Sequence, residues 1–199
     1  MKLTIFSIRS DASFLEFISS NLPLFLCSIQ LFTIPLAAFS KGRVQEAALD
    51  FVFIFGSIGA LGGTYLAGNI FGGSPVLSAD VFFSVATHSV SGFAALYIGF
   101  SGLASMRKEN IFITACIMVC FEIIAYVCNM LFDCNYMFLD NSAGTPFSIV
   151  ETITGGNQLF YSLFVAAIYL VYMSIYYSIY YFSIAMSKQI NKNKSYNKI

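Results

Sequence analysis

The sequence predicts an all-α membrane protein, a polytopic bundle of about five transmembrane helices. Of its 199 residues, 58% are hydrophobic and only 10% are charged, whereas soluble domains carry about 25% charged residues. The apolar residues also gather into long runs that short polar connections separate. The formal net charge is zero, so nothing indicates a nucleic-acid partner, and membrane lipids are the expected partners.

The expected spans follow from helix length, because about 20 apolar residues in helical form cross a bilayer core and satisfy their own backbone groups. They cover residues 22–39, 47–67, 80–103, 111–132 and 159–186. Together they make one transmembrane domain over residues 1–187. Its first 21 residues are compatible with an interfacial helix, and a cleavable signal peptide is not expected there.

Basic residues predict the orientation, because Lys and Arg favour the cytoplasmic side of a membrane. They lie in two of the connections and after the last span: Lys41, Arg43, Arg107, Lys108, Lys188, Lys192, Lys194 and Lys198. The other two connections contain neither Lys nor Arg. We therefore expect the N-terminus outside and the C-terminus inside, in the cell membrane. Residues 188–199 are polar and are expected to form a disordered cytoplasmic tail.

The second span contains Gly56, Gly59, Gly62 and Gly63. Small residues let membrane helices approach each other closely. A second interpretation is that these glycines open a groove for a lipid chain.

Polar side chains inside a membrane are costly, so they are functional candidates by default. The candidates are Cys27, Gln30, Asp50, His88, Glu122 and Asn129. Glu122 lies near the middle of the fourth span, where a buried carboxylate with a hydrogen bond to a neighbouring helix is an equally good interpretation.

The rise of a helix places several candidates at similar depth. Cys27 lies about 8 Å and His88 about 12 Å from the outer ends of their spans, at 1.5 Å per residue. Asn129, Asn135 and Tyr136 fall in or just beyond the same layer. A histidine beside a cysteine can take the thiol proton, and the thiolate can then attack a carbonyl carbon.

The alternative for Cys27 is a small apolar filler, which is the usual state of a buried cysteine. We expect no metal and no cofactor. The chain has a single His, and Cys116 and Cys120 have no second pair that would complete a zinc site.

Three motifs resemble the YwaF-like integral membrane proteins. Residues 22–27, Leu-Pro-Leu-Phe-Leu-Cys, look like a Leu-Pro-Leu-His-Leu-Cys signature, with Phe25 where many relatives have His. Thr87-His88-Ser89 resembles that family's intramembrane His, and residues 135–139 resemble its Asn-Tyr-Met-Phe-Leu motif. The family in turn resembles a eukaryotic transmembrane acyltransferase that moves acyl chains between phospholipids with a Cys and a His.

This resemblance implies an acyltransferase or transacylase in which Cys27 is the nucleophile and His88 the general base. Asn129, Asn135 or Tyr136 would bind the oxyanion or the substrate. The alternatives are a small-molecule binding or transport subunit, whose cavity His88 and Glu122 would line, and a packing subunit of a larger complex. The sequence leaves the oligomeric state open.

Overall fold

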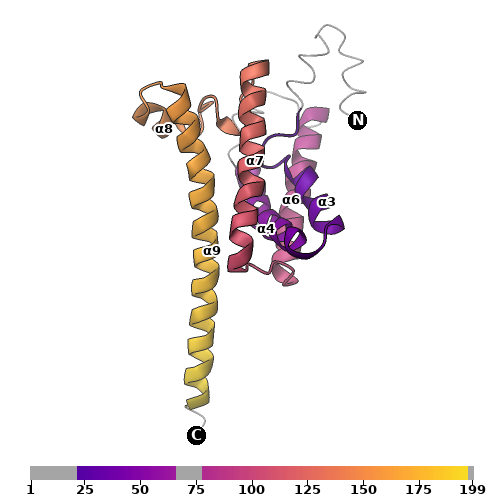
Figure 1. Ribbon diagram of the computed structural model, residues 1–199. Coiled ribbons are helices and arrows are strands. Elements are labelled where there is room, and N and C mark those ends of the chain that lie inside the picture. The colour runs from indigo at the N-terminus through magenta and orange to yellow at the C-terminus, as the bar shows by residue number, and fades with distance from the viewer. Residues whose placement is uncertain (1–21, 66–77, 197–199) are drawn as a thin grey trace.

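The structure is a computed structural model that describes residues 22–65 and 78–196, and within this part of the chain all regular structure is helical (Figure 1). The helices are α3 (Gln30–Phe39), α4 (Gly42–Tyr65), α6 (Ala79–Phe100), α7 (Lys108–Phe132), the 3-10 helix η1 (Tyr136–Phe138), α8 (Ser148–Ile153) and α9 (Gln158–Tyr196). Four of them contain stretches long and apolar enough to cross a membrane: Gly42–Gly63, Val81–Phe100, Lys108–Phe132 and Gln158–Gln189. The predicted polytopic helical bundle is therefore confirmed. The expected interfacial helix over 1–21 lies outside the described residues.

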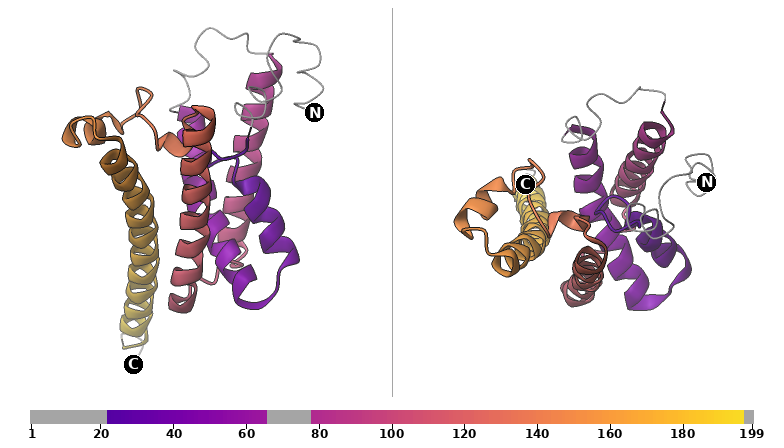
Figure 2. Two further views of the ribbon diagram at one scale, coloured as in Figure 1. Left: turned by 45° about the horizontal axis from the view of Figure 1, so that its top comes forward. Right: turned by 90° about the horizontal axis from the view of Figure 1, so that it is seen from above.

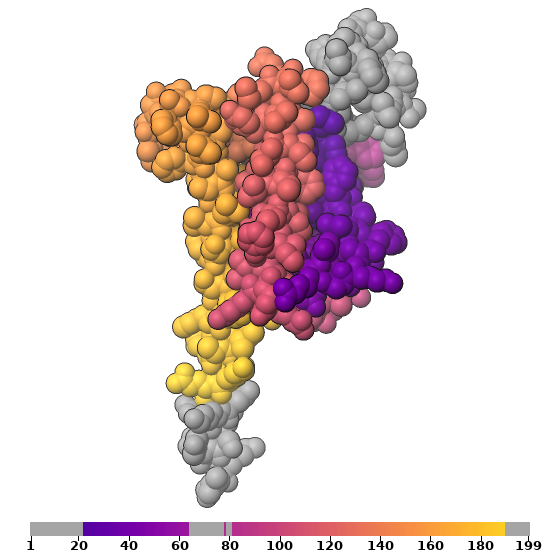
Figure 3. Space-filling view, in the orientation of Figure 1, coloured from indigo at the N-terminus to yellow at the C-terminus, as the bar shows by residue number. Residues whose placement is uncertain are grey.

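Helix α4 is the centre of the bundle and packs against α3, α6, α7 and α9. Its residues Phe51, Val52 and Phe55 are fully buried. Seen from above, the other long helices stand around it (Figure 2), and α7 covers the space between α9 and α3 on the face shown in Figure 3. Because α4 is central, neighbouring helices and loops can enclose polar side chains at both of its ends.

The first expected span is shorter than predicted. Regular helix begins only at Gln30, so α3 has ten residues and a length of about 15 Å. Pro23 disfavours helical geometry at the residue before it, and the chain from Phe25 to Ile29 runs in turns. Irregular backbone at membrane depth is tolerated where protein encloses it, and Ile29 is fully buried.

Helix α9 differs from expectation at its C-terminal end. Its backbone stays helical through Tyr196, although a disordered tail was predicted from residue 188. Residues 187–196 contain neither Gly nor Pro, and an existing helix extends at the gain of one hydrogen bond per residue. Figure 1 shows that this end of α9 projects beyond the rest of the bundle.

A buried carboxylate links α4, α7 and α9 near the α6–α7 connection. Asp50 on α4 is fully buried, and its carboxylate accepts hydrogen bonds from the Met106 backbone N–H (2.9 Å), Asn110 (3.1 Å) and Tyr177 (3.1 Å). Met106 has a φ of 47°, a conformation that costs energy for a residue with a side chain. Asp50 therefore has a structural role, in which it fixes the α6–α7 connection.

Candidate functional site

Cys27 and His88 are brought together by the turn that precedes α3. The Cys27 thiol and the His88 side chain lie near enough to interact electrostatically, and the backbone carbonyl of Cys27 accepts a hydrogen bond from the Ser91 hydroxyl of α6 (3.3 Å). Both residues are half-buried. The structure therefore joins two residues that are 61 positions apart and that the sequence could place only at similar depth.

A carbonyl on the preceding turn of α6 orients the imidazole of His88. Its Nδ1 lies 2.7 Å from the backbone oxygen of Ser84 and 3.4 Å from the hydroxyl of the same residue. A carbonyl can only accept, so Nδ1 carries the proton and donates it to Ser84. The other nitrogen, Nε2, is then the one with a free lone pair, as a general base for a thiol requires.

Two glycines of α4 make room for the pair. A Cβ atom on Gly63 would lie 1.7 Å from Nε2 of His88, and one on Gly59 would lie 3.3 Å from the Cα atom of Cys27. One helical turn separates these glycines, so they line the same face of α4. By contrast, a Cβ atom on Gly62 would have no other atom within 4 Å.

Gly59 and Gly63 therefore let α4 approach its neighbours closely. This is the packing role that the sequence suggested for the glycines, rather than a groove for a lipid chain. Gly56 belongs to the same set, because its Cβ would lie 3.1 Å from the Ser91 carbonyl. The backbone of α4 thus forms one wall of the Cys27–His88 site, and a side chain at position 63 would overlap the imidazole.

The thiol of Cys27, which lies outside the four span-length helices, has a shifted acidity. Burial raises the pKa of the Cys27 thiol, but its interaction with the nearby His88 ring, with smaller contributions from Ser28 and the Cys27 backbone, lowers it below its ordinary value. A lower pKa increases the fraction of thiolate, which is the nucleophilic form.

This shift predicts the pH dependence of alkylation at Cys27. The thiolate persists as the pH falls until the lowered pKa is reached, so the midpoint of the iodoacetamide rate should lie below the value of about 8.5 typical of a free cysteine. In His88→Gln the contribution of the imidazole is lost while burial still raises the pKa of the thiol, so the midpoint should rise above that of the wild-type protein. Mass spectrometry of the Cys27 peptide measures both rates, and identical midpoints in the two proteins would contradict the shift.

The predicted oxyanion residues have other partners. The Asn129 side chain accepts from the backbone N–H of Tyr136 (2.7 Å) and donates to its carbonyl (3.0 Å). The Asn135 side chain bonds Asp140 and Asn141 within the same loop. These two amides shape the loop after α7, so the structure does not aim them at Cys27.

Tyr136 connects that loop to the turn that carries Cys27. Its hydroxyl accepts a hydrogen bond from the backbone N–H of Leu22 (3.0 Å). Its ring meets Phe25 edge-on, with centroids 5.2 Å apart, and Phe25 also lies 6.1 Å from the Phe138 ring. The role of Tyr136 is thus to hold the turn in place, and Phe25 fills the position of the family's usual His with an aromatic contact.

The other polar candidates make no hydrogen bond to the Cys27 or His88 side chain in the described part of the chain. Glu122 is 5% exposed, and its Oε1 has no hydrogen-bond partner among the described residues. All five cysteines are free, and Cys116 and Cys120 are exposed on α7. No group of three His, Cys, Asp or Glu side chains that could hold a metal occurs in residues 22–65 and 78–196.

The residue pattern did not single out Ser84, which accepts a hydrogen bond from His88, or Ser91, which donates one to the Cys27 carbonyl. Ser84 and Ser91 lie four residues before and three residues after His88, so all three share one face of a helix. That spacing, together with the matching interval between Gly59 and Gly63, was the available signal. It could not show that these two faces would meet.

Comparison with known proteins identifies one protein family. No curated protein and no solved structure is detectably similar to the chain. The sequence profile of one transmembrane protein family matches residues 4–177, which includes both Cys27 and His88 and all of the motifs quoted above. This match does not confirm the narrower YwaF-like assignment, which stays a prediction. The chain belongs to the TMEM164 family.

Proposed function

We propose that this protein is a membrane-embedded acyltransferase or transacylase that moves phospholipid acyl chains through Cys27 and His88. The observation that carries the proposal is that the Cys27 thiol lies near an imidazole whose Nδ1 is held by the Ser84 carbonyl. A nucleophile, a base and a group that orients the base are the elements of covalent catalysis. The resemblance to transmembrane Cys/His lipid acyltransferases supplies the substrate class, and the expected location is the cell membrane.

The first half of the proposed reaction loads the enzyme. His88 Nε2 takes the thiol proton, and the Cys27 sulfur attacks the carbonyl carbon of an ester in the donor phospholipid. The tetrahedral intermediate collapses as its carbon–oxygen ester bond breaks. The departing lysophospholipid oxygen takes the proton from His88, and the acyl chain remains on Cys27 as a thioester.

The second half reverses these steps with a different alcohol. The acceptor hydroxyl gives its proton to Nε2 and attacks the thioester carbonyl carbon, and the carbon–sulfur bond breaks. The sulfur leaves as thiolate and is reprotonated by His88. One ester is exchanged for another, so the reaction consumes neither water nor a cofactor.

Backbone groups can stabilise the oxyanion in place of the asparagines. The N–H groups of Leu26 and Cys27 donate no backbone hydrogen bond to another described residue. The N–H of a nucleophile's own residue is a common oxyanion donor. We assign these two N–H groups to that role.

Covalent labelling tests the proposal. Purified protein incubated with a phospholipid that carries a radiolabelled acyl chain should retain label after denaturation, and neutral hydroxylamine should release it, because hydroxylamine cleaves thioesters. The labelled peptide should contain Cys27. Label that resists hydroxylamine, or that is found on Cys116 or Cys120, would refute the acyl-thioester.

A second candidate function rests on Glu122. Its buried carboxyl group has an oxygen without a partner among the described residues, and unpaired ionisable groups within membranes commonly mark substrate or ion pathways. A small-molecule binding or transport subunit would use such a group. The contrast between Cys27 and Glu122 variants separates the two functions, as argued in the Discussion.

A further inference from the structure

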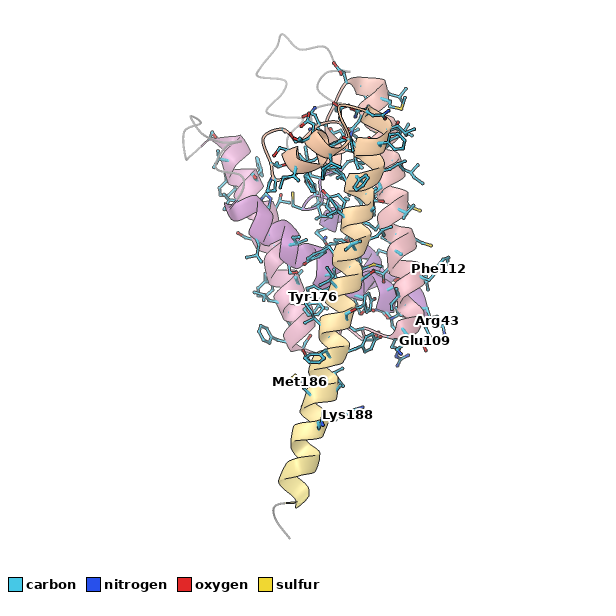
Figure 4. The ribbon with its side chains drawn as sticks, turned by 90° about the vertical axis from the view of Figure 1, so that its left-hand side faces the viewer. Arg43, Glu109, Phe112, Tyr176, Met186 and Lys188 are labelled. Carbon is cyan, nitrogen blue, oxygen red and sulfur yellow. The ribbon has the colours of Figure 1, made fainter. Side chains whose placement is uncertain are left out.

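A second polar site lies at the opposite end of the bundle from the turn that carries Cys27. An open cavity of about 500 Å³ is lined by Arg43 and Glu46 from the start of α4, and by Arg107, Glu109 and Asn110 from the start of α7. Figure 4 shows Arg43 and Glu109 close together beside this end of α7. The volume falls within the range of roughly 300–1,000 Å³ found for small-molecule sites.

Asn110 links the polar side chains at this end of the bundle. It is fully buried, and its Nδ2 donates to Ser105 (2.8 Å), Asp50 (3.1 Å) and Glu46 (3.4 Å). These bonds hold the amide in one orientation. Its Oδ1 has no hydrogen-bond partner among the described residues. This oxygen has almost no accessible surface, so Asn110 contributes to the cavity by holding Glu46 in place.

The charged side chains around the cavity are balanced. Two are cationic, Arg43 and Arg107, and two are anionic, Glu46 and Glu109. Arg107 lies 3.3 Å from Glu46 through one nitrogen only, and its side chain is 63% exposed, which leaves further N–H donors for an anion. A cavity with two charges of each sign is complementary to a ligand that carries both signs.

The start of α7 favours the anionic part of such a ligand. Arg107 is the N-cap residue, and its side chain makes no capping hydrogen bond. The first N–H groups of a helix have no partner within the helix and attract phosphate groups. The two arginines and this helix terminus thus suit a phosphate, whereas the two glutamates suit an ammonium group.

Apolar side chains continue from the cavity along the outside of the bundle. Phe112, one turn further along α7 than Glu109, is 76% exposed, and Val44 on α4 is 44% exposed. Figure 4 shows Phe112 further along the same side of the bundle than Arg43 and Glu109. A ligand with hydrocarbon chains could place them against this surface while its polar part occupied the cavity.

We propose that this cavity binds the headgroup of a zwitterionic phospholipid. Its phosphate lies against Arg43, Arg107 and the α7 terminus, its ammonium group lies against Glu109 and Glu46, and its acyl chains run past Phe112. This site is separate from the Cys27–His88 pair, and the proposal does not depend on the acyltransferase function.

Native mass spectrometry of the purified full chain in detergent tests this proposal. The probes are dioleoylphosphatidylethanolamine, dioleoylphosphatidylglycerol and soluble phosphoethanolamine. We expect the wild-type protein to bind the ethanolamine lipid at least fivefold more tightly than the glycerol lipid, and soluble phosphoethanolamine more weakly than either. Equal binding of the two lipids would refute recognition of the ammonium group. Soluble phosphoethanolamine that binds as tightly as the lipid would refute a membrane source.

Variants assign the binding to the cavity. Arg107→Gln should weaken binding of both lipids about tenfold, as expected for the loss of a charge-assisted hydrogen bond. Glu109→Gln should weaken only the ethanolamine lipid and remove the preference. Lys188→Gln is the matched control, because Lys188 is an exposed cation on α9, away from the cavity (Figure 4). Equal losses in Lys188→Gln and Arg107→Gln would reduce the effect to general charge and overturn the proposal.

Discussion

Cys27→Ala is expected to lower phospholipid acyl transfer about 10³-fold or more, because the variant lacks the nucleophilic thiolate. The assay follows a labelled acyl chain from a donor phospholipid to a lysophospholipid in proteoliposomes. Cys120→Ala is the matched control, since Cys120 is an exposed cysteine of α7. It should retain normal activity.

Glu122→Gln separates the enzyme from the transport alternative. In the acyltransferase, Glu122 takes no part in bond formation, so the variant should lose much less activity than Cys27→Ala. A binding or transport subunit predicts the reverse order, because its cavity needs the Glu122 carboxyl group and Cys27 is incidental. Normal transfer in Cys27→Ala would end the acyl-thioester mechanism, and equal tolerance of both changes would favour a packing subunit.

Gly63→Ala is expected to reduce transfer about 100-fold or more by displacing His88. The added methyl carbon would lie 1.7 Å from Nε2 and 1.8 Å from Cδ2 of the imidazole, far inside van der Waals contact. The ring would have to move while its Nδ1 is bonded to the Ser84 carbonyl. A misplacement of about 1 Å in a catalytic group costs on the order of 10²-fold in rate.

Gly62→Ala is the control for this prediction. A Cβ atom at Gly62 would meet nothing within 4 Å, and alanine favours helix by up to about 1 kcal/mol over glycine. The variant should therefore keep its activity and unfold at the same or a higher temperature. Equal activity of the two alanine variants would show that the imidazole does not depend on the α4 backbone for its position.

Cys27 and His88 illustrate what a sequence can predict about a site. The fixed rise of a helix placed them at similar depth, and the motif resemblance singled them out. Their contact required the turn before α3, whose irregular backbone starts at a proline and is enclosed by other segments. Depth depends on position along one segment, whereas contact depends on the rotation of two segments about their axes, which is set by their packing.

The same depth argument did not predict the partners of Asn129 and Asn135. Asn129 and Asn135 share the predicted layer with Cys27, but their amides bond the loop after α7. A polar side chain satisfies the nearest unpaired backbone groups first. Those groups exist because the loop bends back on itself with positive φ at Asp133 and Met137, and the residue pattern did not predict this backbone path.

The sequence by itself determined that this is a helical membrane protein, because so few charged residues cannot cover a water-facing surface. It also determined most of the span positions, since each long apolar run must satisfy its own backbone in lipid. Only the tertiary structure decided that the first run is a short helix after a turn, that Gly63 rather than Gly62 faces His88, and that Asp50 fixes the α6–α7 connection. The physical reason is that burial from water depends on composition, whereas the choice of neighbour depends on how particular helix faces pack together.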